Sequence, residues 1–449
     1  MRDQRDQLGR GEPSARSARR SVRRQTSKRA AWSLADQAFS SVTNFALASV
    51  VARNVSQDEF GAFALIFSSY LLILGIVRAF STLPLLVRFT NVGDQDWASG
   101  TRPATGSAIV GGALGGVICV AAALVFRNAA GPFLALAISL PGLMLQETWR
   151  LAFVARGDPA KALVNDTVWA IVLVPAVLWA LELEQPTAGV FMLAWGISGT
   201  VAGAVGLLQA RLVPQPKGVV TWTRDHWDLS GRQLGEFATL SGANQSVMYA
   251  AGAIGGLAAA GALRAGQVLL GPLRTVFQAS WFVALSEFVR LLQRRPQALL
   301  RVSIWVSMIM GLAGLAYGAI FVVFGPVLGP ILLGDSWVNA KPLIVPLTIN
   351  AATSGFWLGP NVGLRALQEP SRSLRARLVI GVLTLVGGIV GVIVSGAEGG
   401  AWGLAVAGVV GVGIWWRQFV IAQHGRLTPV QAEPTSDDLL VDRAEDVPV

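Results

Sequence analysis

The stretch WSLADQAFSSVTNFALASVVAR, from Trp32 to Arg53, is long and apolar enough to cross a membrane, yet it contains an acid and an amide. About 20 consecutive apolar residues span the hydrocarbon core of a bilayer as a helix. A carboxylate at a lipid-facing position costs roughly 2.5–3.5 kcal/mol on insertion scales. Asp36 and, two turns later, Asn44 therefore predict a membrane helix whose polar side needs a partner elsewhere in the chain.

The composition extends this interpretation to most of the chain. The 449 residues are 53% hydrophobic and 14% charged, whereas soluble proteins carry about 25% charged residues. Apolar stretches near membrane length recur from Trp32 to Val420, which leaves no room for a large soluble domain. Cys119 is the only cysteine, and this excludes an intramolecular disulfide and a cysteine metal cluster.

Apolar runs between charged residues or Pro/Gly breaks predict an all-α integral membrane protein with twelve transmembrane helices. The predicted spans are 32–52, 60–80, 103–126, 131–154, 167–183, 187–209, 236–257, 262–285, 299–324, 343–364, 378–395 and 400–421. They form two six-helix bundles, 32–210 and 234–421, joined by a cytoplasmic linker, 211–233. Residues 1–31 are expected to be a basic cytoplasmic tail, and 422–449 an acidic, disordered cytoplasmic tail.

The distribution of basic residues predicts the orientation. If the N-terminus is cytoplasmic, 31 of the 36 Lys and Arg fall in inside segments, four fall outside and Arg274 stays within a span. Cytoplasmic loops retain basic residues, so both termini are predicted to be cytoplasmic. The net charge of +10 is therefore interpreted as an orientation signal that also contacts anionic lipid, and no nucleic-acid partner is expected.

An internal repeat appears at an offset of 200 residues. SLADQAFSSVTNF, which starts at Ser33, aligns with QLGEFATLSGANQ, which starts at Gln233, and the same offset later matches Gly61 with Gly261. Six helices per half give both copies the same membrane orientation, so the halves are predicted to be related by a pseudo-two-fold along the membrane normal. The polar columns that match are Asp36/Glu236, Ser41/Ser241 and Asn44/Asn244.

Each polar trio falls within one broad helical face, so two such helices can form the walls of a hydrated cavity. In that setting an acid does not meet lipid. An alternative is that Asp36 and Glu236 lie near the cytoplasmic interface and interact with helix N-termini. Interhelical hydrogen bonding is an alternative for Asn44 and Asn244.

Arg274 is the most informative cation, because it lies about mid-span just after a Gly271–Pro272 break. A guanidinium offers a planar fork suited to phosphate oxygens. An alternative role for Arg274 is to pair with a buried acid such as Glu236. Arg78 and Arg264 lie nearer span ends, where a snorkelling role at the interface is favoured.

The polar residues show no catalytic constellation, so we do not expect an enzyme. Both histidines, His226 and His424, fall in predicted cytoplasmic segments. Glu147 and Arg150, spaced i,i+3, are interpreted as a mutually neutralising pair. No metal site and no organic cofactor is predicted.

Several segments together resemble the polysaccharide exporters of the multidrug/oligosaccharidyl-lipid/polysaccharide (MOP) flippase superfamily. They are WSLADQAFSSVTNFALASVVARNVSQDEFGAFAL, LQETWRLAFVARGDPAKALVND, LSGANQSVMYAAGAIGGLAAAGALRAGQVLLGPL and LLGDSW. The resemblance covers nearly everything from Trp32 to about Ile421. It departs from the family where relatives often carry an acid before the proline after helix 2, because here Leu83 precedes Pro84.

The resemblance implies a V-shaped pair of bundles around a cavity that opens alternately to each side of the cytoplasmic membrane. It implies a flippase that moves an undecaprenyl-diphosphate-linked oligosaccharide for cell-surface polysaccharide synthesis, in contact with membrane lipids and with other polysaccharide-synthesis proteins. Coupling to a proton or sodium gradient or to the membrane potential is expected. The rival functions are a drug/cation antiporter of the same superfamily, a lipid II flippase, a non-transporting scaffold of a polysaccharide-synthesis complex and, last, a membrane-bound glycosyltransferase.

The same resemblance suggests roles for the polar residues. Arg274, with Arg78 or Arg264 in support, would contact the diphosphate. The sugar hydroxyls would be contacted by the amides and hydroxyls of Asn44, Asn244, Ser41 and Ser241. Asp36 and Glu236 would bind the coupling ion.

Overall fold

A computed structural model describes residues 39, 41–90 and 92–427. Every regular element in these ranges is a helix, which confirms the predicted fold class. Asp36, the tail 1–31 and the end of the acidic tail from residue 428 lie outside the described residues.

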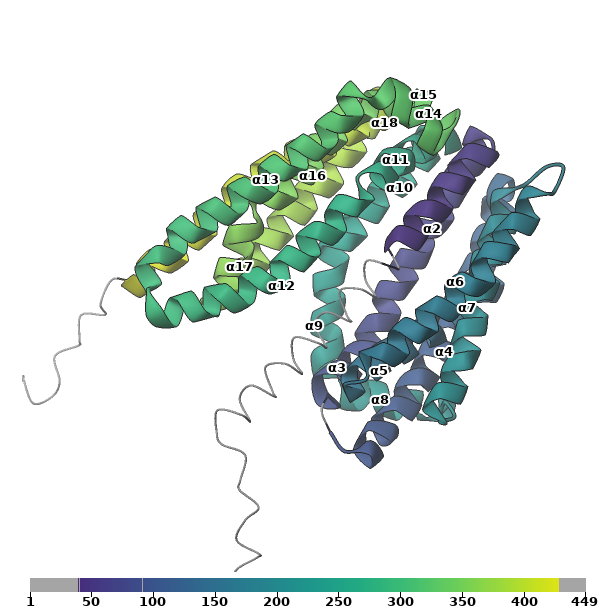
Figure 1. Ribbon diagram of the computed structural model, residues 1–449, viewed down its shortest axis with the longest axis horizontal. Coiled ribbons are helices and arrows are strands. Elements are labelled where there is room, and N and C mark those ends of the chain that lie inside the picture. The colour runs from purple at the N-terminus through teal and green to yellow at the C-terminus, as the bar shows by residue number, and fades with distance from the viewer. Residues whose placement is uncertain (1–38, 40, 91, 428–449) are drawn as a thin grey trace, which may run out of the picture.

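The N-terminal half, which we call the N-lobe, contains six helical segments (Figure 1). The first is helical over residues 41–54, and the second passes through a π-helical turn without ending. The elements that follow residue 54 are α2 (Gln57–Val77), η1 (Arg78–Thr82), α3 (Leu83–Arg88), α4 (Asp94–Val125), α5 (Ala130–Arg156), α6 (Pro159–Leu181) and α7 (Ala188–Ala210).

The linker forms a short helix, α8 (Val219–Asp225), and leads into the C-terminal half, which we call the C-lobe. The first C-lobe segment also contains a π-helical turn, whereas the N-lobe turn lies in the second segment. The C-lobe elements are α9 (Trp227–Phe237), η4 (Ala238–Gly242), α10 (Ala243–Ile254), α11 (Leu257–Leu269), α12 (Gly271–Arg294), α13 (Leu299–Val323), α14 (Gly325–Leu333), α15 (Ser336–Ala340), α16 (Ile344–Phe356), α17 (Leu358–Ala366) and α18 (Pro370–Leu427).

Seven helices of the described chain are long and apolar enough to span a membrane, and an eighth span appears if the bent pair α11–α12 is counted as one. Interruptions account for the difference from twelve. The first span is described only in part, the continuous helix α9–η4–α10 is rich in polar residues, and a turn at Trp357 divides α16 from α17. Helix α18 contains a kink at Ser395 and Gly396, where Gly396 has φ +59°, so it holds two predicted spans. Each of the twelve predicted spans thus has a helical counterpart, the first of them over its described residues only.

Several helices begin earlier than their apolar runs. Helix α4 begins at Asp94 instead of residue 103, and α6 begins at Pro159 instead of 167. The apolar run that predicts a span ends at the first charged residues, whereas the backbone hydrogen bonding of the helix continues past them. Asp94 and Asp96 also lie in the first turn of α4, where the helix dipole favours negative charge.

Large apolar side chains face outward from both lobes. Leu124 and Leu208 in the N-lobe are 74% and 77% exposed, and Val394 in the C-lobe is 74% exposed. In a soluble protein such surfaces would drive association. On a helical bundle of this hydropathy they suit contact with lipid, and the chain is a multi-pass membrane protein.

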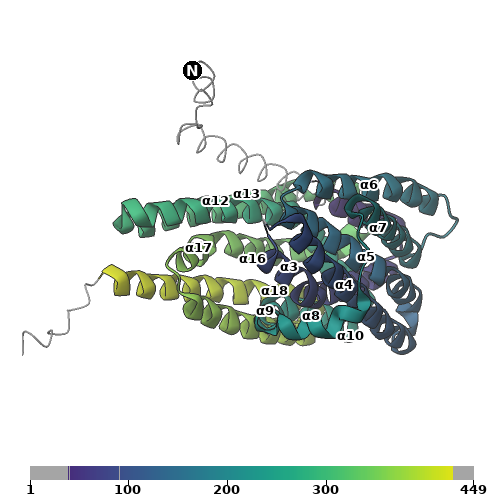
Figure 2. The same ribbon diagram turned by 90° about the horizontal axis from the view of Figure 1, so that it is seen from below.

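The lobes diverge from a contact between α2 and α11 (Figure 1), and Figure 2 shows α12, α13 and α17 of the C-lobe lying apart from α4–α7 of the N-lobe in a view from below. A Cβ added at Gly61 would overlap the Leu257 carbonyl oxygen, and one added at Gly261 would lie 3.0 Å from the Gln57 carbonyl oxygen. Both pairs of equivalent residues differ by the repeat offset of 200. The contact is therefore reciprocal, as a two-fold requires, and it supports the predicted pseudo-symmetry.

The lobes also meet at the end formed by α14 and α15. The Arg53 guanidinium donates to the Ile331 carbonyl at 2.7 Å, and the Ser336 hydroxyl donates to the Ala52 carbonyl at 2.9 Å. Gln57 and Asn339 are hydrogen-bonded through their side chains. We call these contacts the α14–α15 clasp; they close the end that the basic-residue distribution predicts to be outside.

Candidate functional site

Two polar cavities lie where the lobes face each other. The N-lobe cavity, of about 390 Å³, has polar lining residues that include Ser41, Asn44, Arg78, Glu147 and Arg150. The C-lobe cavity, of about 240 Å³, has polar lining residues that include Ser241, Asn244, Gln245 and Asn350. Arg264, Gln267 and Arg274 line both, so α11 and α12 form a shared basic wall.

All seven residues that the sequence suggests for substrate binding line these cavities. Four come from the repeated polar columns of the first helix in each lobe, and three are the arginines. They are Ser41, Asn44, Ser241, Asn244, Arg78, Arg264 and Arg274. The polar columns thus predict which helical faces turn inward, because lipid cannot satisfy them.

Glu236 lies elsewhere. Its carboxylate accepts a hydrogen bond from the Arg377 guanidinium at 3.0 Å, in a separate pocket near the start of α18. The expectation that it lines the central chamber is therefore corrected, and so is the alternative that it pairs with Arg274. Glu236 precedes the π-helical turn η4, whereas the cavity-lining Ser241 lies within that turn and Asn244 follows it. Its coupling-ion role, like that of Asp36, stays a prediction.

A backbone break brings Arg264 and Arg274 to one wall. Helix α11 ends at Leu269, and α12 begins at Gly271 with an axis bent by 49°. Pro272 has no N–H and suits the first turn of a new helix. The predicted Gly271–Pro272 break is confirmed, and it lets residues on two successive helices face the same space.

The shared wall carries the positive charges of Arg264 and Arg274. Among the described residues, neither Arg264 nor Arg274 forms an ion pair. The Arg264 guanidinium stacks 4.1 Å from the centre of the Phe67 ring, and its buried Nε has no described hydrogen-bond partner. Arg264 and Arg274 line the same two cavities, so an anion bound in either cavity would meet both positive charges.

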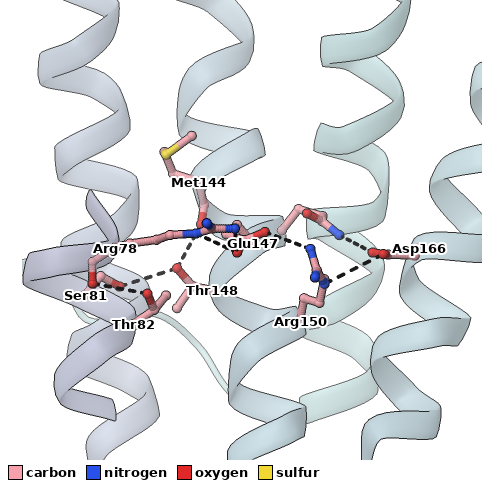
Figure 3. Close-up of polar contacts among 9 residues, drawn as sticks. Arg78, Ser81, Thr82, Met144, Glu147, Thr148, Arg150 and Asp166 are labelled. Atoms are coloured by element: carbon pink, nitrogen blue, oxygen red, sulfur yellow. Dashed lines mark hydrogen bonds and ion pairs between the residues drawn. The ribbon is translucent and has the colours of Figure 1, made fainter. Parts of the chain in front are cut away.

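The opposite wall of the N-lobe cavity holds an ion-pair network (Figure 3). Arg78 Nε donates to a carboxylate oxygen of buried Glu147 at 2.9 Å, and Arg150 donates to its other oxygen at 3.3 Å. Arg150 also lies 3.8 Å from the Asp166 carboxylate, which accepts from Gln146 at 2.9 Å. We call Arg78, Glu147, Arg150 and Asp166 the N-lobe network.

The network corrects two sequence-based interpretations. Glu147 and Arg150 do pair, but Arg78 joins them from a position 69 residues away. Arg78 is not at a span end, because the helix continues through η1 and α3 to Arg88. Snorkelling therefore does not describe it. Hydropathy could not locate the end of this helix, since the apolar run stops before the helical backbone does.

Helix 1 is tied to the shared wall. The Ser41 hydroxyl and the Thr275 hydroxyl are 2.7 Å apart, which joins the N-lobe to the residue that follows Arg274. On the C-lobe side, Asn350 donates to the Leu404 carbonyl at 2.8 Å. The cavities thus combine fixed cations with hydroxyl and amide groups, a set that matches a phosphorylated, hydroxyl-rich ligand.

Protein-family profiles give no match to this sequence, and neither do curated proteins. Solved structures do match. An inward-facing MATE-family multidrug resistance transporter of the MOP superfamily superposes with a TM-score of 0.63 at 15% identity, covering 86% of this chain and 96% of that one. The lipid II flippase MurJ in an inward closed conformation gives 0.61 at 11% identity, covering 92% of each chain.

A third match is a MOP superfamily transporter from Pyrococcus furiosus, described as having a binding pocket of reverse polarity. Its TM-score is 0.55 at 13% identity, and the alignment covers 88% of this chain and 96% of that one. At these identities the likeness concerns the fold. The chain has the fold of MOP superfamily transporters.

Proposed function

We propose that this chain, which has the MOP transporter fold, is a flippase that moves an undecaprenyl-diphosphate-linked oligosaccharide across the cytoplasmic membrane by alternating access for cell-surface polysaccharide synthesis. The observation that carries the proposal is the shared wall, where Arg264 and Arg274 line both cavities without a described ion-pair partner. A diphosphate is the part of such a substrate least able to enter hydrocarbon. Fixed guanidinium groups in a polar cavity replace its hydration while the lipid tail stays in the bilayer.

The cavity lining also suits the rest of the headgroup. Ser41 and Asn44 lie on one side of the shared wall, and Ser241 and Asn244 lie on the other. Hydroxyl and amide groups donate and accept hydrogen bonds, so they can follow sugar hydroxyls without demanding one stereochemistry. Arg78 in the N-lobe network would support the diphosphate once its bond to Glu147 is exchanged for one to phosphate.

A drug/cation antiporter would need a carboxylate available to a cation. Among the described lining residues of the two cavities the one acid is Glu147, which lies in the N-lobe cavity and is already held by two arginines. A cationic ligand would also meet Arg264 and Arg274. The lining therefore favours an anionic substrate, and a lipid II flippase, which shares a lipid-diphosphate headgroup with the main proposal, is the second candidate because of the likeness to MurJ.

Coupling to a proton or sodium gradient, or to the membrane potential, is part of the proposal. Asp36 and Glu236 are the proposed coupling residues, with Glu236 acting through its ion pair with Arg377. Exchange of that pair for a bound proton or cation would change how η4 meets the start of α18. The Glu236→Gln variant should then alter the dependence of transport on the ion gradient more than it alters substrate binding.

The proposal is tested by replacing Arg274 with Ala in a strain whose surface polymer depends on this protein. We expect polymer export to fall and the lipid-linked oligosaccharide to accumulate, with protein level in the membrane unchanged. Arg290→Ala is the matched control, because Arg290 lies on the same helix, is exposed and pairs with Glu287 at its own i,i+3 spacing. A scaffold would keep export in both variants, and unchanged export in an Arg264→Ala, Arg274→Ala double variant would refute the flippase.

A further inference from the structure

A second charged pocket lies on the C-lobe, away from the central cavities. It has a volume of about 560 Å³ and lies between α12, the end of α17 and the start of α18. Its charged lining residues are Arg365, Arg377, Glu236 and Glu369. The basic-residue distribution predicts this end of the C-lobe to be cytoplasmic, at the level of the lipid headgroups.

The charge balance of this C-lobe pocket leaves Arg365 available. Glu236 is paired with Arg377 at 3.0 Å, and Glu369 is paired with Arg372 at 3.5 Å. Arg365 is exposed, forms no ion pair with a described residue, and lies 5.2 Å from the ring centre of Trp281. Its guanidinium is thus held in place by a ring without being neutralised.

Arg377 is oriented but only partly satisfied. Its side chain is 16% exposed, and one terminal nitrogen donates to Glu236 while the buried Nε has no partner in the described part of the chain. A buried donor without a partner is costly, so a ligand oxygen there would be stabilising. Arg365 lines the same pocket as Arg377. The unpartnered Nε and the presence of two guanidinium groups in one pocket indicate an anionic ligand.

The rest of the pocket is apolar. Leu285 and Val289 of α12 and Leu374 of α18 line it, and Val289 and Leu374 are 42% and 43% exposed. A pocket with two guanidinium groups at one end and aliphatic side chains along its wall matches an amphiphile. Basic pockets between membrane helices on the cytoplasmic side are suited to lipid headgroups.

We infer that this C-lobe pocket binds the phosphate headgroup of a lipid in the cytoplasmic leaflet, through Arg365 and Arg377, with an acyl or prenyl chain along Leu285 and Leu374. The site is distinct from the substrate cavities and does not depend on the transport proposal. The phosphate can come from a bulk anionic phospholipid or from the diphosphate of a polyprenyl carrier.

The position of the pocket relates it to the central cavities. Arg274 and Leu285 are 11 residues apart on α12, which is about three helical turns, so they lie on nearly the same face about 17 Å apart along the axis. A polyprenyl diphosphate bound in the pocket would therefore lie on a direct line along α12 to the shared wall. In that case the pocket would be a loading site.

The inference is tested by native mass spectrometry of the purified full chain, titrated separately with phosphatidylglycerol, phosphatidylcholine and undecaprenyl diphosphate. Loss of one charge-assisted hydrogen bond weakens binding about tenfold or more, so Arg365→Gln and Arg377→Gln should each reduce the bound fraction accordingly. Arg375→Gln is the matched control, because Arg375 is exposed on the same helix and does not line the pocket. Arg365→Gln also serves as the variant that leaves the Arg377–Glu236 ion pair intact.

The outcomes separate the two sources. Reduced phosphatidylglycerol binding with phosphatidylcholine binding unchanged supports a bulk-lipid site. A loading site is supported if Arg365→Gln or Arg377→Gln reduces the binding of undecaprenyl diphosphate, and if the same reduction is seen in an Arg274→Ala background. The inference would be overturned if the wild type, Arg365→Gln and Arg377→Gln all bound phosphatidylglycerol equally and all bound undecaprenyl diphosphate equally. A transport defect in Arg274→Ala would leave these outcomes unchanged, because the measured quantity is lipid binding.

Discussion

Replacing Glu147 with Gln should destabilise the N-lobe and, at the same time, make its cavity more attractive to anions. Glu147 has a 6% exposed side chain and accepts from both Arg78 and Arg150. Removing one partner of a buried ion pair costs about 3–5 kcal/mol because the other charge is left uncompensated. Arg78 is 44% exposed, so water recovers part of that loss.

The expected net cost is therefore about 2–3 kcal/mol, below the fully buried figure. Arg150 contributes to this cost, because its side chain is 15% exposed and loses its 3.3 Å contact with Glu147. The released Arg78 then joins Arg264 and Arg274 around one cavity. The variant should therefore bind a polyprenyl diphosphate more tightly although it is less stable. If Glu147 had only a structural role, its replacement would lower both stability and ligand affinity.

The assay is thermal unfolding of the detergent-purified protein, followed by tryptophan fluorescence, with and without polyprenyl diphosphate. Glu287→Gln is the control, because Glu287 pairs with Arg290 at an exposed i,i+3 position worth about 0.3–0.5 kcal/mol. We expect a clear loss of apo stability for Glu147→Gln and a larger stabilisation by ligand than in the wild type. If Glu147→Gln matches Glu287→Gln in both respects, the reasoning about the N-lobe network is wrong.

Three further predictions follow from the fold. Gly61→Ala should disrupt the contact of α2 with α11 and abolish transport, because the new Cβ would overlap the Leu257 carbonyl oxygen. Gly131→Ala is the control and should be tolerated, because its Cβ would meet nothing within 4 Å. Transport assays and gel filtration check both variants. In a Cys119→Ala background, a cysteine introduced at Val338, which is 69% exposed, should react with an impermeant maleimide in intact cells. A cysteine introduced at Val220, which is 79% exposed, should react only after the cells are permeabilised. The reverse pattern would show that the predicted orientation is wrong. Ser336→Ala combined with Arg53→Ala should loosen the α14–α15 clasp, seen as faster labelling of a cysteine at Asn44, and an unchanged rate would show that the clasp does not control access.

The sequence was enough to predict what depends on solvation by lipid. Hydropathy located the twelve spans, and the repeat at an offset of 200 pointed to Ser41, Asn44, Ser241 and Asn244, because a polar side chain within a span must face inward. The Gly271–Pro272 break was also readable, since proline cannot continue the backbone hydrogen bonding of a preceding turn.

The parts that sequence could not supply depend on which helices pack together. The bond from Arg78 to Glu147 joins α5 to the π-helical turn after α2, and no local spacing encodes it. Glu236 fits the repeat by alignment, yet it turns to Arg377, which is 141 residues away. Pseudo-symmetry relates backbones, whereas each carboxylate takes the nearest cation that its own lobe provides.

The glycine contact between α2 and α11 has a mechanical consequence. Gly61 and Gly261 bring backbone against backbone at the crossing, while larger side chains, such as Arg264 on Phe67, pack beside it. Because glycine has no side chain, the two backbones can shift against each other at these positions without a rotamer change. In the alternating access proposed above, this crossing would act as a close-fitting pivot, and a side chain at either glycine would hinder the movement of one half against the other.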